Sequence, residues 1–164
     1  MHKLIFVGIL FLILVSCKEK VQKANSEDAV AQELPTEKWP RKLSVDPKAS
    51  TILREWPEYN AMDISFDAIY NISNKEDLSL TIENIIEEQK LLEDSEYPIE
   101  FDKPQIKSRQ KVFKTYVLKV KGDLIYRLDP QESVLEMINA YNTLRKQFNV
   151  VVKNTFDSKL LLDE

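Results

Sequence analysis

Two pairs of carboxylates are the first residues in this sequence whose types and spacing suggest chemistry. Asp63 lies four residues before Asp67, and Glu83 lies four residues before Glu87. On a helix such residues are neighbours, so each pair could bind a hard cation or share a proton, since adjacent like charges raise one pKa. The simpler interpretation is a solvated acidic face, and we expect that one. The sequence therefore predicts no metal site and no cofactor.

The chain contains one histidine, His2, and one cysteine, Cys17. His2 belongs to a segment, residues 1–16, whose apolar stretch runs from Leu4 to Val15. That stretch is too short to span a bilayer, which takes about 20 residues, but it is typical of a secretory signal peptide. We therefore exclude residues 1–16 from the fold.

The end of this segment, Leu14-Val15-Ser16-Cys17, resembles the lipobox of bacterial lipoproteins. The resemblance implies a diacylglyceryl group on the thiol of Cys17, cleavage after Ser16 and acylation of the new amino group. A residue that carries several acyl chains is a lasting membrane anchor, whereas one chain binds only marginally. The alternative is an ordinary signal peptide followed by a free or buried thiol. It is less favoured, because no second cysteine is present to form a disulfide.

The residues after the cysteine bear on the membrane to which the protein is sorted. Position 18 holds Lys18 and not the aspartate that retains bacterial lipoproteins in the inner membrane, so the resemblance implies the outer membrane. Lys18-Glu19 also resembles the start of the charged export tag of some Bacteroidetes lipoproteins. The periplasmic and the surface face both stay open.

Loss of His2 and acylation of Cys17 would remove most catalytic chemistry from the mature chain. It could form no Ser-His-Asp triad, no Cys-His pair and no usual zinc or haem site. Gly122 would be its only glycine, so a glycine-rich phosphate-binding loop is excluded as well. We expect a protein that is not an enzyme.

Charge is unevenly distributed along the chain, which has 23 basic and 27 acidic side chains. This acidic balance predicts no nucleic-acid partner. A helix over residues 76–96 would carry an acidic face that consists of Glu76, Glu83, Glu87 and Asp94. A following helix would carry a basic strip that consists of Lys107, Lys114 and Lys121. These seven residues are the candidate partner-binding residues. The simpler interpretation, which we favour, is inter-helix ion pairing beside the core for the strip and a solvent-facing surface for the acidic residues.

The domain boundaries follow from composition. Residues 17–45 are polar, charged and without sustained periodicity, so they are predicted to be the lipid anchor and a flexible tether, in which Trp39-Pro40 could dock on the domain or a partner. Residues 46–156 are predicted to form one helical domain, and residues 157–164 a C-terminal tail.

Apolar residues at steps of three and four predict four helices in this domain. The first begins with Asp46 as cap and Pro47 at the first helical position, and Pro57 inside it predicts a kink or break near Glu55. Trp56 and Tyr59 beside that proline are expected in the core, or alternatively in a partner-binding notch opened by the kink.

The other three helices also have start signals. Ser73 and Glu76 have the spacing of a capping box, a third helix runs from about Pro104 to Leu128, and Asp129-Pro130 begins a fourth. The predicted core positions are Ile52, Trp56, Tyr59, Met62, Phe66, Ile69, Leu78, Ile82, Ile85, Ile86, Gln89, Leu92, Ile106, Phe113, Val117, Val120, Leu124, Leu128, Val134, Met137, Ile138, Tyr141, Leu144, Phe148, Val151 and Val152. Short connections predict an all-α, up-down four-helix bundle with a kinked or broken first helix.

One segment permits a second interpretation. Residues 111–128 are rich in valine and tyrosine and could form a hairpin that turns at Gly122-Asp123. We favour a helix, because the helical apolar face continues through Gly122 without a change of phase.

Three functions remain after these exclusions, of which an enzyme that uses only carboxylates is the least favoured. The favoured hypothesis is a lipid-anchored helical adaptor that binds another envelope protein, and the alternative is a sensor or carrier that binds a small ligand or a metal ion within the bundle.

Overall fold

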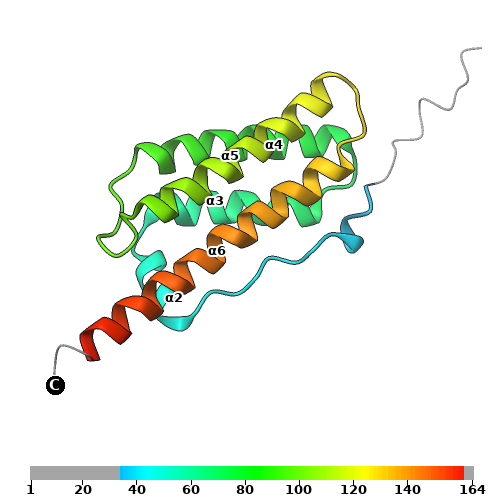
Figure 1. Cartoon of the computed structure of the whole chain (residues 1–164). Coiled ribbons are helices and arrows are strands. Elements are labelled where there is room, and N and C mark those ends of the chain that lie inside the picture. The colour runs from blue at the N-terminus through cyan, green and yellow to red at the C-terminus, as the bar shows by residue number, and fades with distance from the viewer. Residues whose placement is uncertain (1–33, 161–164) are drawn as a thin grey trace, which may run out of the picture. The chain divides into compact units, whose positions relative to one another are not determined.

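All the secondary structure of the described residues is helical (Figure 1). The computed structural model describes residues 34–160, with the side chains of residues 34–154. The elements in chain order are η2 (Thr36–Lys38), α2 (Pro47–Arg54), α3 (Pro57–Asp67), η3 (Ala68–Asn71), α4 (Lys75–Asp94), α5 (Pro104–Ile125) and α6 (Gln131–Leu160). No strand occurs within residues 34–160, so this part of the chain is all-α, as predicted.

Four predicted features, among them the C-terminal tail with residues 161–164, fall partly or wholly on residues outside the described range. The signal peptide 1–16 and the lipidation site Cys17 lie outside it, as do residues 18–33 of the tether. At the other end, helix α6 continues to Leu160, into the stretch that was predicted to be the tail. None of the helices within 34–160 has the length and apolar character needed to cross a membrane.

The first predicted helical stretch consists of two helices. The side chain of Asp46 accepts a hydrogen bond from the N–H of Lys48 (3.0 Å), and Pro47 begins α2, as predicted. Helix α2 ends at Arg54 and α3 begins at Pro57. Trp56 between them has extended dihedral angles (φ −112°, ψ 92°), because a residue that precedes proline is disfavoured in the helical region.

The predicted cap of α4 was wrong by one residue. Asn74, not Ser73, is the cap, and its side-chain oxygen accepts a hydrogen bond from the N–H of Asp77 (2.8 Å). The Asp77 carboxylate in turn accepts one from the N–H of Ser73 (3.3 Å). Asparagine is at least as good a helix cap as serine, and this choice satisfies donors on both sides of the helix start.

Helix α5 runs through Gly122 to Ile125, so the helical interpretation of residues 111–128 is correct and the hairpin is not. The helix ends earlier than predicted, because Arg127 has a left-handed backbone (φ 56°). The N–H of Leu128 bonds the carbonyl of Asp123 (2.8 Å) and that of Arg127 bonds Leu124 (3.2 Å), which is the Schellman pattern of a helix end. Leu128, predicted in the core, is consequently exposed.

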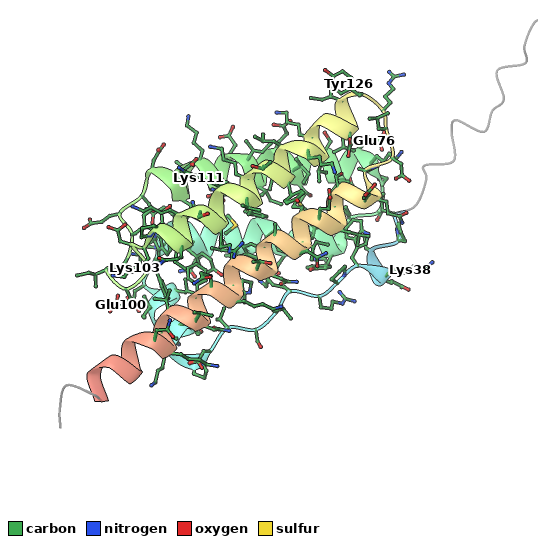
Figure 2. The ribbon with its side chains drawn as sticks, in the orientation of Figure 1. Lys38, Glu76, Glu100, Lys103, Lys111 and Tyr126 are labelled. Carbon is green, nitrogen blue, oxygen red and sulfur yellow. The ribbon has the colours of Figure 1, made fainter. Side chains whose placement is uncertain are left out.

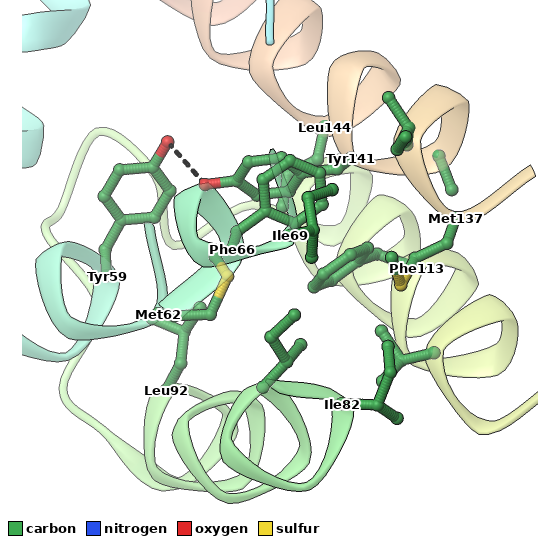
Figure 3. Packing of buried hydrophobic residues seen from close by; sticks show 14 of the residues in the cluster. Tyr59, Met62, Phe66, Ile69, Ile82, Leu92, Phe113, Met137, Tyr141 and Leu144 are labelled. Atoms are coloured by element: carbon green, nitrogen blue, oxygen red, sulfur yellow. Dashed lines mark hydrogen bonds between the residues drawn. The ribbon is translucent and has the colours of Figure 1, made fainter. Parts of the chain in front are cut away.

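The helices enclose one hydrophobic core, built from most of the predicted positions (Figure 3). Phe66, Phe113 and Tyr141 form its centre, with ring centroids 4.0 Å apart for Phe66 and Tyr141 and 5.0 Å apart for Phe113 and Tyr141. The core also contains Leu34, Trp39 and Phe101, which helical periodicity could not identify because all three lie outside the predicted helices.

Residues 34–46, here named the strap, pack against the helices and are not the flexible tether that their composition predicted. Leu34 and Trp39 are buried in the core cluster. The Tyr70 hydroxyl donates a hydrogen bond to the carbonyl of Pro40 (2.8 Å), and the N–H of Leu43 donates one to the Asn142 side chain (2.8 Å). Local composition does not reveal this packing, because the polar backbone of the segment is satisfied by side chains that are distant in the sequence, 30 residues away for Pro40 and 99 for Leu43.

The strap lies along the seam between α3 and α6 (Figure 1). The two helices run in opposite directions, since Tyr59 contacts Phe148 (5.3 Å between ring centroids) and Phe66 contacts Tyr141. Their backbones do not approach as closely as those of α3 and α4, α4 and α5, or α5 and α6. The strap therefore covers the one seam that the helices leave wide.

Arg145 of α6 connects the three parts of this seam. Its side chain is buried, and Nε donates to the carbonyl of Leu43 in the strap (2.5 Å). Its Nη1 donates to the Tyr59 hydroxyl (2.8 Å) and to the Asp63 carboxylate (2.8 Å), both on α3. Tyr141 also donates a hydrogen bond to Asp63. One guanidinium thus joins strap, α3 and α6.

The two phenols of this network stay protonated at neutral pH. Burial, reinforced by the negative charge of Asp63, raises the pKa of Tyr59 to about 12, and burial raises the pKa of Tyr141 well above its usual value. Tyr141 therefore acts as a donor toward Asp63, and its hydroxyl lies 3.4 Å from that of Tyr59 (Figure 3).

We predict that Gly122→Ala raises the free energy of unfolding by about 0.5 to 1 kcal/mol, because glycine is the poorest non-proline helix former. Gly122 has a negative φ, and a Cβ built on it meets nothing within 4 Å. Urea denaturation followed by circular dichroism measures the change. Ser108→Ala, at an exposed position of the same helix, is the control and should give a smaller gain. A loss of stability in Gly122→Ala would contradict the prediction.

We predict that Arg145→Met lowers the free energy of unfolding by about 2 to 3 kcal/mol. The change leaves the part-buried carbonyl of Leu43 and the buried hydroxyl of Tyr59 without the donor that Arg145 supplies, and deletes one partner of Asp63. The expected loss of stability lies at the lower end of the range for breaking a buried ion pair, because Asp63 keeps its ion pair with Lys42.

The matched control is Lys146→Met, at the next and exposed position of α6, which should change stability by less than about 0.5 kcal/mol. Equal effects of the two substitutions on the urea midpoint would mean that Arg145 does not hold the seam.

Candidate partner-binding groove

A groove opens where the break between α2 and α3 meets the connection between α4 and α5. Its volume is about 1070 Å³, and it is open to solvent along one side. Two prolines shape its walls: Pro57 begins α3 and ends the preceding helix, and Pro98 lies in the connection, residues 95–103. Figure 2 shows this end of the domain at Glu100 and Lys103.

The floor of the groove is aromatic and held in place. Trp56 is only 2% exposed, and its indole N–H donates a hydrogen bond to the Ser95 hydroxyl (2.9 Å). The Tyr97 ring lies against it, with 4.8 Å between centroids, and the Tyr97 hydroxyl donates to Gln110. Burial raises the pKa of Tyr97, so this hydroxyl remains a donor at neutral pH. The floor is therefore apolar and already ordered.

The walls of the groove are acidic. Five carboxylates line it, on Glu55, Glu58, Glu96, Glu100 and Asp102, against one lysine, Lys107. That lysine pairs with Asp102 (2.5 Å) and lies over the Tyr97 ring, 4.8 Å from its centroid. The other four carboxylates form no ion pair with any residue in the described part of the chain. The groove consequently carries a net negative charge.

An exposed apolar side chain completes the groove. Ile99 is 81% exposed, the largest exposed fraction among the large hydrophobic residues described. It follows Pro98 in the connection and lines the opening. An apolar floor and rim within a ring of carboxylates suit a ligand that combines positive charge with apolar side chains.

The sequence hypothesis for Trp56 and Tyr59 was that they lie in the core, with a notch beside Pro57 as the alternative. Both rings are buried, 5.9 Å apart between centroids, and Trp56 also lines the groove. Sequence reasoning missed Tyr97, Ile99 and Glu100 entirely. The available signal was the alternation of apolar and acidic residues between Pro98 and Pro104, which does not show where the connection folds.

The predicted basic strip faces acidic groups of its own domain. Lys121 pairs with Glu83 of α4 (2.9 Å), Lys114 pairs with Glu93 of α4, and Lys107 pairs with Asp102. The first two are inter-helix ion pairs between α5 and α4, as the structural interpretation expects, and the third joins α5 to the connection that precedes it. Such exposed pairs contribute little stability, typically below about 1 kcal/mol.

The predicted acidic face lies on the exposed side of α4. Glu76, Glu83, Glu87 and Asp94 are all exposed, and only Glu83 forms an ion pair with another described residue. The structure does not bring the remaining three against the basic strip or into the groove.

The Asp63 and Asp67 pair is neither a solvated face nor a cation site. The Lys42 ammonium of the strap lies 2.9 Å from Asp63 and 2.6 Å from Asp67, and thus occupies the position that a cation would take. Within residues 34–154, no group of three or more acidic, histidine or cysteine side chains is arranged to hold a metal ion.

The chain matches no protein-family model, no curated protein and no solved structure.

Proposed function

We propose that this chain is an outer-membrane lipoprotein, anchored by acyl chains on Cys17, whose helical domain is a binding adaptor and not an enzyme. Its partner in this proposal is another envelope protein, which presents a basic segment with apolar side chains to the acidic groove. The anchoring part is supported by Leu14-Val15-Ser16-Cys17, which follows an apolar run of signal-peptide length.

The groove is the observation that carries the binding part of the proposal. Its aromatic floor is preorganised by the hydrogen bond from Trp56 to Ser95, so little side-chain ordering is required when a partner binds. The four carboxylates without ion pairs favour a cationic segment and increase its rate of encounter. Of the two surfaces first considered, the basic strip is paired within the domain, and the groove is preferred to the acidic face of α4 because it combines carboxylates with an apolar floor.

For the fold, we propose an up-down four-helix bundle in which α2 and α3 together form the first, broken member. The proposal is supported by the opposite directions of neighbouring helices. Lys121 contacts Glu83 and Lys114 contacts Glu93 between α4 and α5, and Lys119 contacts Glu136 between α5 and α6.

The binding proposal is tested by photo-crosslinking in intact envelopes, with a photoreactive residue in place of Ile99 at the groove. Ile64, which is also exposed but lies on α3 outside the groove, is the control position. We expect a specific protein adduct from position 99 and not from position 64. Mass spectrometry should place the crosslink on a partner segment that is rich in lysine or arginine.

A charge reversal distinguishes binding to the carboxylates of the groove from a general effect of the protein's surface charge. Glu58→Lys with Glu100→Lys should lower the adduct yield at position 99 about tenfold, since two favourable charges become unfavourable. Glu76→Lys with Glu87→Lys makes the same change in net charge on the exposed face of α4 and should leave the yield unchanged. Equal yields from both double variants, or an adduct on an acidic segment, would contradict the proposal.

A further inference from the structure

The end of the domain opposite the groove carries an apolar tip. Ile125 is 64% exposed, Tyr126 77% and Leu128 54%, and the three lie within four consecutive positions at the end of α5 and the start of its connection to α6. Single exposed apolar residues are common on protein surfaces, but several at neighbouring positions are typical of a contact site. These three residues, with Arg127 among them, are here named the tip.

The backbone of the tip is held in one conformation by the end of α5. The two Schellman hydrogen bonds fix the turn, and Arg127 occupies its left-handed position. Glycine is the usual residue there, since a side chain makes that conformation unfavourable. The hydrogen bonds require the left-handed conformation but not an arginine, and residues strained in this way concentrate at functional positions.

The tip lies at the end of the domain where the chain from Cys17 enters. Leu34 and Pro35 share a hollow with Ile72 and Ser73, immediately before α4 begins. Because α5 runs opposite to α4, its last turn lies beside the first turn of α4. Figure 2 shows Tyr126, Glu76 and Lys38 together at this end, with Glu100 and Lys103 at the other.

The length of the chain up to Leu34 limits how far this end can lie from the lipid. Leu34 is the seventeenth residue after Cys17, so even a fully extended chain spans at most about 60 Å, and any less extended chain holds the tip nearer. Tyrosine, arginine and leucine are the side chains that suit a membrane interface, where an aromatic ring or long cationic chain keeps its polar end in water.

We propose that the tip contacts the bilayer that anchors the protein, and that this contact orients the domain with the acidic groove away from the membrane. The inference rests on the proposed lipid anchor at Cys17. The contact is mainly apolar, because Arg127 is flanked by Asp123 and Asp129, which offset its charge toward anionic headgroups. A second anchoring point would stop the domain from turning freely on a single attachment.

The test uses the full lipidated chain in phosphatidylcholine vesicles. Cys17 is the only cysteine and is acylated in this proposal, so Leu128→Cys can be labelled selectively with an environment-sensitive NBD fluorophore. We expect a blue-shifted emission and strong quenching by spin-labelled lipids in the same vesicles. Ile99→Cys, at the groove end, is the matched control and should show water-exposed emission with little quenching.

Two further measurements, in high salt and with a polar variant of the tip, show whether the contact with the bilayer is apolar. Quenching at position 128 should hardly change between about 0.1 M and 1 M NaCl, since an apolar contact is not screened. Ile125→Ser with Tyr126→Ser should reduce the quenching at least severalfold, while the protein stays in the membrane fraction.

Three results would overturn the proposal. Equal quenching at positions 99 and 128 would mean that the domain has no fixed orientation. A blue shift at position 128 without quenching by lipid would mean that protein, such as a second copy of the chain, covers the tip. Loss of quenching in high salt would mean an electrostatic contact. A different result would show that Cys17 is not lipidated: the chain would then be absent from the membrane fraction, and Cys17 would carry no acyl label.

Discussion

The guanidinium of Arg145 is the interaction on which the seam of this domain depends. Helices α3 and α6 are too far apart for close backbone packing, and the strap covers the space between them. Arg145 belongs to α6, and its side chain donates hydrogen bonds to Leu43 of the strap and to Tyr59 and Asp63 of α3. A buried cation is unfavourable unless it is fully hydrogen-bonded, so this position of the strap is favoured over others that would leave the charge unsatisfied.

The strap has a consequence for how the domain is presented. It enters at the end where α4 begins and reaches α2 at the opposite end, so it spans the length of the helices (Figure 1). The two ends differ in chemistry, with exposed apolar residues at the entry end and an acidic groove at the other. This difference supports the proposal that the domain is held at one end and binds a partner at the other.

The lysine pattern in the sequence identified a surface that interacts within the domain, and not the candidate binding surface. The seven-residue repeat of Lys107, Lys114 and Lys121 marks a flank of α5, and acidic groups on α4 and the following connection are within reach of it. The groove instead combines residues from α2, α3 and the α4–α5 connection. The groove residues follow no common sequence period, because their segments come together only after the chain has reversed direction. Ile99 and Tyr97 were therefore missed, although Trp56 and Pro57 were noted.

The sequence by itself determined the all-helical fold, most core positions, the helix start at Asp46, and the continuation of α5 through Gly122. These depend on hydrogen bonds and side-chain contacts between residues no more than a few positions apart. Tertiary structure decided that the strap is ordered, that Lys42 neutralises Asp63 and Asp67, and that a groove forms beside Trp56. Each of these requires side chains from separate segments to meet, and the free energy of such contacts depends on the geometry of packing, which a single sequence does not specify.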